Sequence, residues 1–131
     1  MVSIRWVLTP WSGPSTIIHN PEEPNAEPKK FAFDFSYWSH DSFVDRGDGY
    51  MEPEPGSNYA SQQMVFDDLG RGVLKNAYEG YNTSLFAYGQ TGAGKSYSMV
   101  GYGMNKGIVP ITCDNLFQHI ESCQGQGQQM W

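Results

Sequence analysis

Polar and apolar residues alternate strictly in one short stretch of the chain. Its aromatic positions are Phe31, Phe33, Phe35 and Tyr37, and they are separated by Ala, Asp and Ser. Because successive side chains of a strand point to opposite faces, this spacing places the four rings on one face. The pattern predicts a half-buried β-strand over residues 31–37.

A second pattern predicts a helix over about residues 59–79. Asn58 is the expected N-cap, and Gly80 stands where a left-handed C-terminal cap is expected. Gly70 and Gly72 each weaken this helix by about 1 kcal/mol. The apolar positions that follow helical spacing are Phe66, Leu69, Val73 and Ala77, with Val65, Leu74 and Tyr78 beside them.

Shorter signals define the rest of the N-terminal half. Residues 1–16 carry a weak strand signal followed by turn residues, and residues 17–19 predict a short strand. Three prolines and three glutamates make residues 20–28 a predicted loop. Residues 39–57 are polar, acidic and rich in Gly and Pro, so they predict a long exposed loop.

Residues 89–96 read Gly-Gln-Thr-Gly-Ala-Gly-Lys-Ser, which is the phosphate-binding pattern G-x-x-x-x-G-K-[ST]. Residues 83–88 predict a strand that enters this loop, and residues 95–100 predict a helix that leaves it, which is the context the pattern requires. A chance glycine-rich turn carrying Lys-Ser is the alternative, and the matching flanks disfavour it. Residues 101–106 predict a loop, and a further helix is expected to carry Pro110 in its first turn and to end near Cys123.

The residue types of this loop suit a polyphosphate. Gly89, Gly92 and Gly94 allow the backbone to wrap closely around the anion. Successive backbone N–H groups then point to the phosphates, and the start of the helix adds partial positive charge. Lys95 would reach the β- and γ-phosphates, and the Ser96 hydroxyl would coordinate Mg²⁺.

The order strand, helix, strand, phosphate loop, helix predicts an α/β fold of the P-loop nucleotide-binding type. In this fold a central sheet is flanked by helices. The helix over residues 59–79 would cross one face of the sheet. It would carry the chain from the aromatic strand to the strand that bears the loop.

Length, charge and cysteine usage limit the function classes. The chain has 131 residues, enough for at most one domain, and its net charge of -6 argues against a nucleic-acid surface. No apolar run is long enough for membrane insertion. Cys113 and Cys123 fall on one predicted helix about 15 Å apart, too far for a disulfide, so both are expected to be reduced thiols of a cytosolic protein. The three histidines are too scattered to predict a metal site.

The surroundings of the loop resemble the first part of a kinesin motor domain. The matching segments are residues 31–35 (Phe-Ala-Phe-Asp-Phe), Tyr81-Asn82, residues 86–99 and residues 107–110 (Gly-Ile-Val-Pro). Residues 35–40 (Phe-Ser-Tyr-Trp-Ser-His) resemble class-three transport kinesins. We therefore expect a divergent segment over residues 1–14 and a partial motor domain over residues 15–131, with residues 41–57 as an insertion.

The resemblance implies an ATP-driven microtubule motor with ATP and Mg²⁺ as cofactors and tubulin as partner. It places the phosphates on Gly89, Gln90, Thr91, Gly92, Ala93, Gly94, Lys95 and Ser96, and Mg²⁺ on Ser96. It places Tyr97 against the adenine. It also implies a cytoplasmic, cytoskeleton-associated protein that carries vesicle cargo through a tail not present in this sequence.

The sequence departs from the kinesin pattern at both ends. The R-x-R-P motif that packs against adenine does not have its usual spacing in residues 1–10, and the switch sequences N-x-x-S-S-R and D-x-A-G-S-E do not occur. Because hydrolysis requires groups that clamp the γ-phosphate and position water, we assign no catalytic residue. The chain alone is expected to be marginally stable and to lack microtubule-stimulated ATPase activity.

Two alternatives stay open from the sequence. The chain is the N-terminal part of a motor (as a fragment, a truncated gene model or a short isoform), or it is a non-motor module that binds ATP or a partner. Other P-loop NTPases fit less well. A GTPase would carry an N-K-x-D motif, which this chain lacks, and a myosin loop would carry Glu where Gln90 stands.

Overall fold

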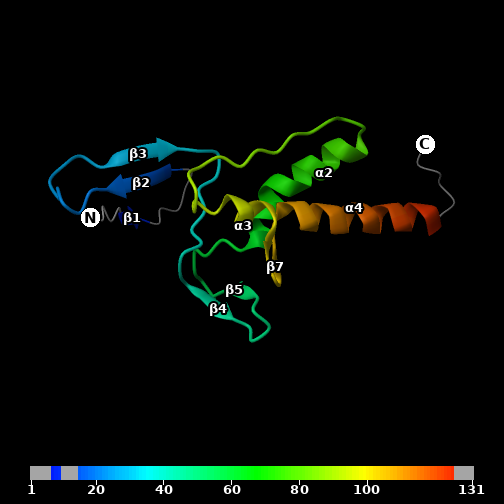
Figure 1. Ribbon diagram of the computed structural model, residues 1–131, viewed down its shortest axis with the longest axis horizontal. Coiled ribbons are helices and arrows are strands. Elements are labelled where there is room, and N and C mark those ends of the chain that lie inside the picture. The colour runs from blue at the N-terminus through cyan, green and yellow to red at the C-terminus, as the bar shows by residue number, and fades with distance from the viewer. Residues whose placement is uncertain (1–6, 10–14, 126–131) are drawn as a thin grey trace.

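A small antiparallel sheet lies at one end of the molecule and two helical segments lie at the other (Figure 1). The structure, a computed structural model, describes residues 7–9 and 15–125. The sheet contains β1 (Val7–Thr9), β2 (Ser15–His19) and β3 (Lys29–Ala32), in the order β1-β2-β3. Strand β2 includes the short strand predicted at residues 17–19, and the predicted loop 20–28 joins it to β3. Strand β1 lies within residues 1–16, where the sequence carries a weak strand signal. Most of residues 1–14 lie outside the described residues.

The aromatic stretch is only partly a strand. Strand β3 ends at Ala32, so the prediction of a strand over residues 31–37 is wrong beyond that point. The rings of Phe31, Phe33 and Phe35 are 45%, 54% and 47% exposed, so the predicted buried face is not buried. No element among the described residues covers this face. The ring of Phe35 instead stacks on that of Tyr37, with centroids 6.1 Å apart.

The segment predicted as a long loop, residues 39–57, contains a β-hairpin. Strands β4 (Phe43–Asp45) and β5 (Met51–Pro53) pair antiparallel. The Asp45 carboxylate organises the turn by accepting hydrogen bonds from the N–H groups of Gly47 and Gly49, at 2.8 and 3.2 Å. Both glycines have left-handed φ angles, 87° and 85°, which a residue with a side chain adopts only with strain. The alternation of turn glycines with aspartates was the signal that the loop prediction missed.

The central helix begins later than predicted. It consists of α1 (Gln62–Val65), the π-helical segment η1 (Phe66–Gly70) and α2 (Arg71–Tyr78). Its N-cap is Ser61, whose hydroxyl accepts from the Met64 N–H at 3.2 Å, so the prediction of Asn58 as cap is wrong. The residue before the cap, Ala60, lies outside the helix, and its N–H donates to the Trp38 carbonyl at 2.6 Å. Gly80 follows the helix with φ 80°, as predicted.

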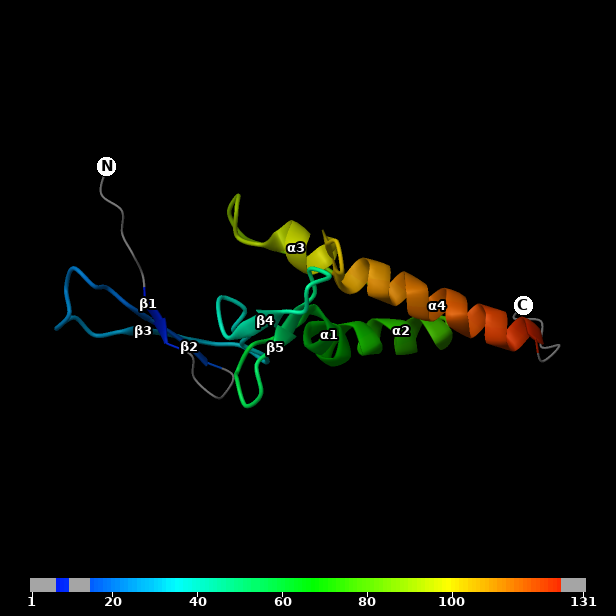
Figure 2. The same cartoon turned by 90° about the horizontal axis from the view of Figure 1, so that it is seen from below.

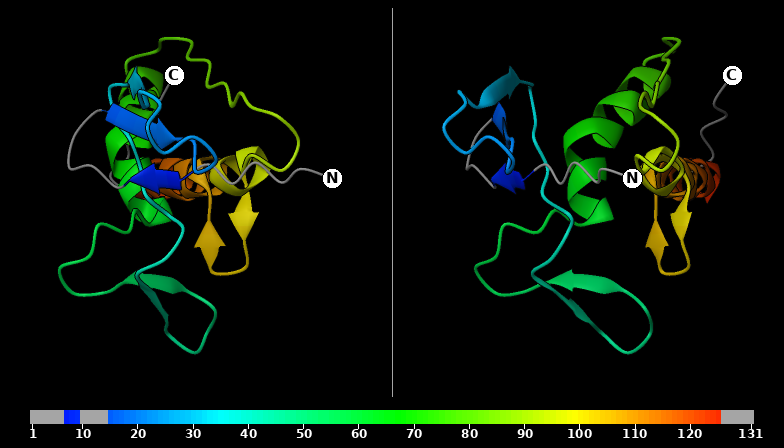
Figure 3. Two further views of the ribbon diagram at one scale, coloured as in Figure 1. Left: turned by 90° about the vertical axis from the view of Figure 1, so that its left-hand side faces the viewer. Right: turned by 60° about the vertical axis from the view of Figure 1, so that its left-hand side comes forward.

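The C-terminal part of the chain follows the predicted order of elements with one addition. Helix α3 (Lys95–Met99) leaves the phosphate loop, and α4 (Ile108–Gly125) carries Pro110 in its first turn and continues two residues past Cys123. Between them the predicted loop forms a tight hairpin of β6 (Gly101–Tyr102) and β7 (Asn105–Lys106). The β4–β5 and β6–β7 hairpins project from the same side of the helices (Figure 3).

The main packing contact lies between the central helix and α4, which run side by side (Figure 2). The buried apolar residues are Tyr59, Ala60, Phe66, Leu74 and Ile108. They come from the segment just before the central helix, from η1 and α2 within it, and from the start of α4. This small core fixes the helices and, through them, the segment that follows the phosphate loop.

The predicted strand over residues 83–88 does not form. Residues 81–89 are extended but have no strand neighbour among the described residues, and Phe86 and Tyr88 are 87% and 101% exposed. A strand exists only when a neighbouring strand takes up its backbone N–H and C=O groups. The α/β class is confirmed, with short sheets and helices, while the strand that enters the loop is not present in the described part of the chain. No helix in that part has the length and apolar character needed to cross a membrane.

Candidate phosphate-binding site

The phosphate loop, residues 89–96, adopts the left-handed conformations that its glycines permit. Gly92 and Gly94 have φ angles of 83° and 86°, and the space beside each is empty where a Cβ atom would stand. The constraint on these two positions is therefore conformational rather than steric. The N–H of Ala93 donates to the Gln90 carbonyl at 3.1 Å, which closes a turn inside the loop.

Lys95 is folded back over this loop. Its ammonium nitrogen donates to the carbonyl oxygens of Gly89 and Gln90, both at 2.7 Å. Two neutral acceptors thus hold a half-buried ammonium group at the loop. Lys95 takes part in none of the salt bridges found among the described residues, so no carboxylate pairs with its positive charge. An anion at the loop would gain a charge-assisted hydrogen bond from this group.

The other predicted phosphate ligands are accessible to solvent. Gln90, Thr91, Gly92, Ala93, Gly94 and Ser96 are exposed, and Gly89 and Lys95 are intermediate. Helix α3 has five residues and begins with the Ser98 N–H bonded to the Gly94 carbonyl at 2.9 Å. Because so short a helix adds little dipole, an anion at this loop would depend mainly on the backbone N–H groups and Lys95. The donor set fits a polyphosphate, and the free Ser96 hydroxyl fits a Mg²⁺ ligand.

Tyr97 points toward the β4–β5 hairpin. Its hydroxyl lies 3.7 Å from the Met51 sulfur, and its backbone carbonyl accepts from the Gln62 side-chain amide at 2.5 Å. The Tyr59 hydroxyl lies 3.5 Å from the same sulfur. Tyr97 is therefore held on two sides by residues from distant parts of the sequence, and its contact with adenine stays a prediction.

A cleft of about 640 Å³ opens beside the loop. Its walls are Tyr37, Trp38, Ser39 and His40 on one side and Gly92, Ala93 and Gly94 on the other. The ring of His40 meets that of Trp38 edge-on, with centroids 6.1 Å apart. The sequence reasoning did not assign these aromatic residues to the site, although the adjacent aromatic residues Tyr37 and Trp38, at the end of the alternating stretch, were the available signal.

Two carboxylates fix the aromatic wall of this cleft. The Trp38 indole N–H donates to Asp41 at 2.9 Å, and this hydrogen bond is the main cause that lowers the pKa of the Asp41 carboxyl. The Tyr37 hydroxyl donates to Asp68 at 2.9 Å. Burial, followed by the hydrogen bond to Asp68, raises the pKa of the Tyr37 phenol well above its ordinary value. Tyr37 consequently stays a neutral donor throughout the physiological pH range.

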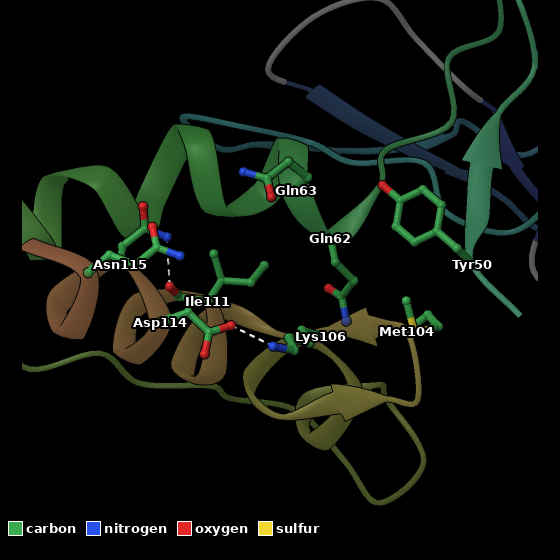
Figure 4. Close-up of a pocket in the computed structure, with 9 residues that line it drawn as sticks. Tyr50, Gln62, Gln63, Met104, Lys106, Ile111, Asp114 and Asn115 are labelled. Carbon is green, nitrogen blue, oxygen red and sulfur yellow. Dashed lines mark hydrogen bonds and ion pairs between the residues drawn. The ribbon is translucent and has the colours of Figure 1, made fainter. Parts of the chain in front are cut away.

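A second, smaller cavity of about 260 Å³ lies between the β4–β5 hairpin, the start of the central helix and α4 (Figure 4). Lys106 and Asp114, both in its lining, form an ion pair at 2.5 Å, and the Tyr50 ring stands on the side of the β4–β5 hairpin. None of the predicted phosphate ligands lines it. The described residues contain no group of three or more His, Cys, Asp and Glu side chains arranged to hold a metal ion.

Comparison with known proteins gives the same family for nearly the whole chain. Residues 6–130 match the family model described as the kinesin motor domain. Kinesin-like protein KIF28 of Rattus norvegicus is 54% identical over 108 residues, which is 82% of this chain and 10% of the relative. Kinesin-related protein 1 of Dictyostelium discoideum is 52% identical over 111 residues, which is 83% of this chain and 4% of the relative. The chain thus spans about a tenth or less of these relatives.

Solved structures agree on the fold. A KIF14 motor fragment with ADP, in complex with a microtubule, aligns with a TM-score of 0.72 and 35% identity over 97% of this chain and 30% of its own. The KIF14 dimer with AMP-PNP, in a two-heads-bound complex with a microtubule, aligns with a TM-score of 0.71 and 37% identity over 92% of this chain and 29% of its own. Together with the loop geometry, these matches confirm the family expected from the sequence: the chain belongs to the kinesin motor domain family.

Proposed function

We propose that residues 89–96 bind the phosphates of ATP together with Mg²⁺, as the nucleotide-binding part of a microtubule motor. The observation that carries this proposal is the position of the Lys95 ammonium group, 2.7 Å from two carbonyls of a loop built on left-handed glycines. The nucleotides in the two KIF14 complexes, ADP and AMP-PNP, support an adenine nucleotide as the ligand.

Each part of the loop has a distinct task in this proposal. The backbone N–H groups between Gly89 and Gly94 receive phosphate oxygens, and Lys95 exchanges its carbonyl acceptors for phosphate oxygens. Ser96 supplies a hydroxyl to Mg²⁺, and Tyr97 contributes to the adenine side. When bound, Mg²⁺-ATP supplies the phosphoryl group whose hydrolysis drives movement. In this proposal residues 1–14 are a divergent N-terminal segment and residues 15–131 a partial motor domain.

The wider activity is proposed for the protein to which this domain belongs. The KIF14 structures are described in complex with a microtubule, which supports tubulin as the partner. We propose that such a motor couples ATP hydrolysis to movement along microtubules in the cytoplasm, and that it carries vesicle cargo through segments outside this sequence. No catalytic residue is assigned within residues 1–131.

A titration with a fluorescent ATP analogue, with and without Mg²⁺, tests nucleotide binding directly. Saturable binding that Mg²⁺ strengthens and unlabelled ATP reverses is the expected result. Competition by pyrophosphate would place the interaction at the phosphate loop. Absence of saturable binding by a chain that is folded by circular dichroism would refute the proposal.

A second function, a non-motor module that binds ATP or a partner, is favoured by one observation. Residues 81–89 are extended, have no strand neighbour among the described residues and expose Phe86 and Tyr88 almost completely. Such a segment can pair with a strand of another polypeptide. Reading the transcript through both ends separates the two functions. The switch sequences N-x-x-S-S-R and D-x-A-G-S-E in the same reading frame support the motor, and a stop codon after Trp131 supports the module.

A further inference from the structure

The β4–β5 hairpin is fastened to the segment that follows the phosphate-loop helix by one buried side chain, Asn105. Its amide oxygen accepts from the Met51 N–H at 2.9 Å, and its amide nitrogen donates to the Gly49 carbonyl at 2.8 Å. Asn105 is only 6% exposed, and both ends of its amide are satisfied by the hairpin backbone. It therefore binds the hairpin in the way that a neighbouring strand would.

The backbone of Asn105 is in turn packed against the end of the phosphate-loop helix. A Cβ atom added to Gly101 would lie within van der Waals overlap of the Asn105 carbonyl oxygen, at 2.0 Å. Gly101 has φ 82° and follows Val100, the C-cap residue of α3, so both its conformation and the nearby Asn105 backbone exclude a side chain at this position. The backbone of Asn105 therefore lies directly against the residue that follows the C-cap of α3.

The β4–β5 hairpin also reaches the middle of α3. Met51, whose N–H is held by Asn105, brings its sulfur to 3.7 Å from the Tyr97 hydroxyl. On the other side, the buried amide of Gln62 donates to the Tyr97 carbonyl at 2.5 Å. Tyr97 stands two positions after Lys95, so these contacts fix the short helix on which the phosphate-binding ammonium group is carried.

We propose that Asn105 is a positioning residue for nucleotide binding, which acts by docking the β4–β5 hairpin against α3. This inference rests on the proposed function and deepens it, because it makes residues 41–57 part of the nucleotide-binding machinery. Docking of the hairpin and binding of ATP are then coupled, and the coupling is reciprocal: ATP stabilises the docked hairpin, and the docked hairpin raises the affinity for ATP.

Two readouts on the 131-residue chain test the proposal. The first is the dissociation constant for a fluorescent ATP analogue. The second is the rate at which trypsin cuts after Arg46, at the tip of the hairpin, followed by mass spectrometry. In the wild type we expect ATP to slow this cut. In Asn105→Ala we expect faster cutting that ATP does not slow, and a dissociation constant raised about fivefold or more.

Two further variants keep the test independent of folding defects. Met51→Leu keeps the apolar volume but removes the sulfur, and we expect it to weaken ATP binding in the same direction by a smaller factor. Asn115→Ala is the matched control, because its amide donates only to Ile111 within α4, at 2.8 Å. It is expected to leave both readouts at their wild-type values.

The outcomes separate this inference from the proposed function. Wild-type binding of ATP with an unchanged dissociation constant in Asn105→Ala and Met51→Leu overturns the positioning role and leaves the proposed function intact. Failure of the wild type to bind ATP overturns the proposed function and this inference with it. If Asn105→Ala loses its helical circular dichroism, Met51→Leu decides the question, since a dissociation constant equal to the wild type overturns the inference.

Discussion

The ammonium nitrogen of Lys95 lies 2.7 Å from the carbonyl oxygen of Gly89, so the one basic residue of the phosphate loop contacts its first glycine. This contact closes the loop on itself. The Lys95 ammonium group therefore lies where phosphate is expected to bind. Binding would replace its two carbonyl acceptors with phosphate oxygens.

Replacement of this lysine is expected to weaken nucleotide binding selectively. Lys95→Ala removes a charge-assisted hydrogen bond worth about 1.5–3 kcal/mol, which corresponds to roughly a 10- to 100-fold rise in the dissociation constant for ATP. Titration of a fluorescent ATP analogue measures it. Lys75→Ala is the control, because Lys75 lies on α2 in an exposed pair with Glu79 at 4.0 Å, away from the loop. Equal affinity of wild type and Lys95→Ala would show that the loop does not hold the phosphates.

Replacement of glycine by alanine is expected to lower the stability of the fold at one position of the central helix and to raise it at another. A Cβ atom on Gly70 would lie 2.2 Å from the Phe66 ring, which is only 1% exposed and has no room to move. Gly70→Ala is therefore expected to destabilise the fold by about 1–3 kcal/mol through overpacking. Gly72 meets nothing within 4 Å, and Gly72→Ala is expected to stabilise by about 0.5–1 kcal/mol through helix propensity.

Urea unfolding followed by circular dichroism compares these two variants under identical conditions. The pair controls itself, since both changes add one methyl group to the same continuous helix. Stabilisation by both substitutions would mean that the Phe66 ring does not occupy the place described here. The sequence rule treated these glycines as equivalent, and the buried ring makes them different.

The sequence predicts what depends on local backbone chemistry. The glycine pattern of residues 89–96 predicts the loop, and Pro110 and Gly80 mark a helix start and a helix end correctly. Prediction from the sequence fails where a contact with a residue far along the chain determines the local structure. The cap of the central helix moves from Asn58 to Ser61 because the Ala60 N–H is held by Trp38, a contact that helical spacing cannot reveal.

The candidate site divides in the same way. Every predicted phosphate ligand follows from the contiguous motif. The aromatic wall at residues 37–40 and the hydrogen bonds of Asn105 to the β4–β5 hairpin instead depend on contacts between residues far apart in sequence. Asn105 in particular lies in a segment predicted as a loop, where an asparagine is ordinary. Only the meeting of two hairpins gives its amide a partner at both ends.

Alkaline pH is expected to destabilise the fold through Tyr59. Burial, followed by the neighbouring Tyr97, raises the pKa of the Tyr59 phenol to about 12 from an ordinary value of 10.0. The folded state therefore favours the neutral phenol. The stability that this phenol contributes is complete below pH 10 and is lost progressively as the pH rises from 10 to about 12.

The free energy of unfolding at a series of pH values, measured by urea titration, checks this effect. Tyr59→Phe cannot ionise at this position and is expected to lose less stability than the wild type between pH 10 and about 12. Tyr102→Phe, at an exposed position of the β6–β7 hairpin, is the control and should follow the wild-type curve. Identical alkaline profiles for Tyr59→Phe and the wild type would contradict the role of this buried phenol.

The segment that enters the phosphate loop is expected to cause self-association of the chain. Phe86 and Tyr88 are 87% and 101% exposed on an extended segment without a strand neighbour among the described residues, and burying each ring gains about 1.5–3 kcal/mol. Phe86→Ser with Tyr88→Ser should lower the fraction of dimers and larger species in sedimentation velocity. Phe117→Ser removes an exposed ring from α4 without touching this segment and should change that fraction less. A larger decrease in this fraction for Phe117→Ser would locate the association surface on α4 and would contradict self-association through the segment before the loop.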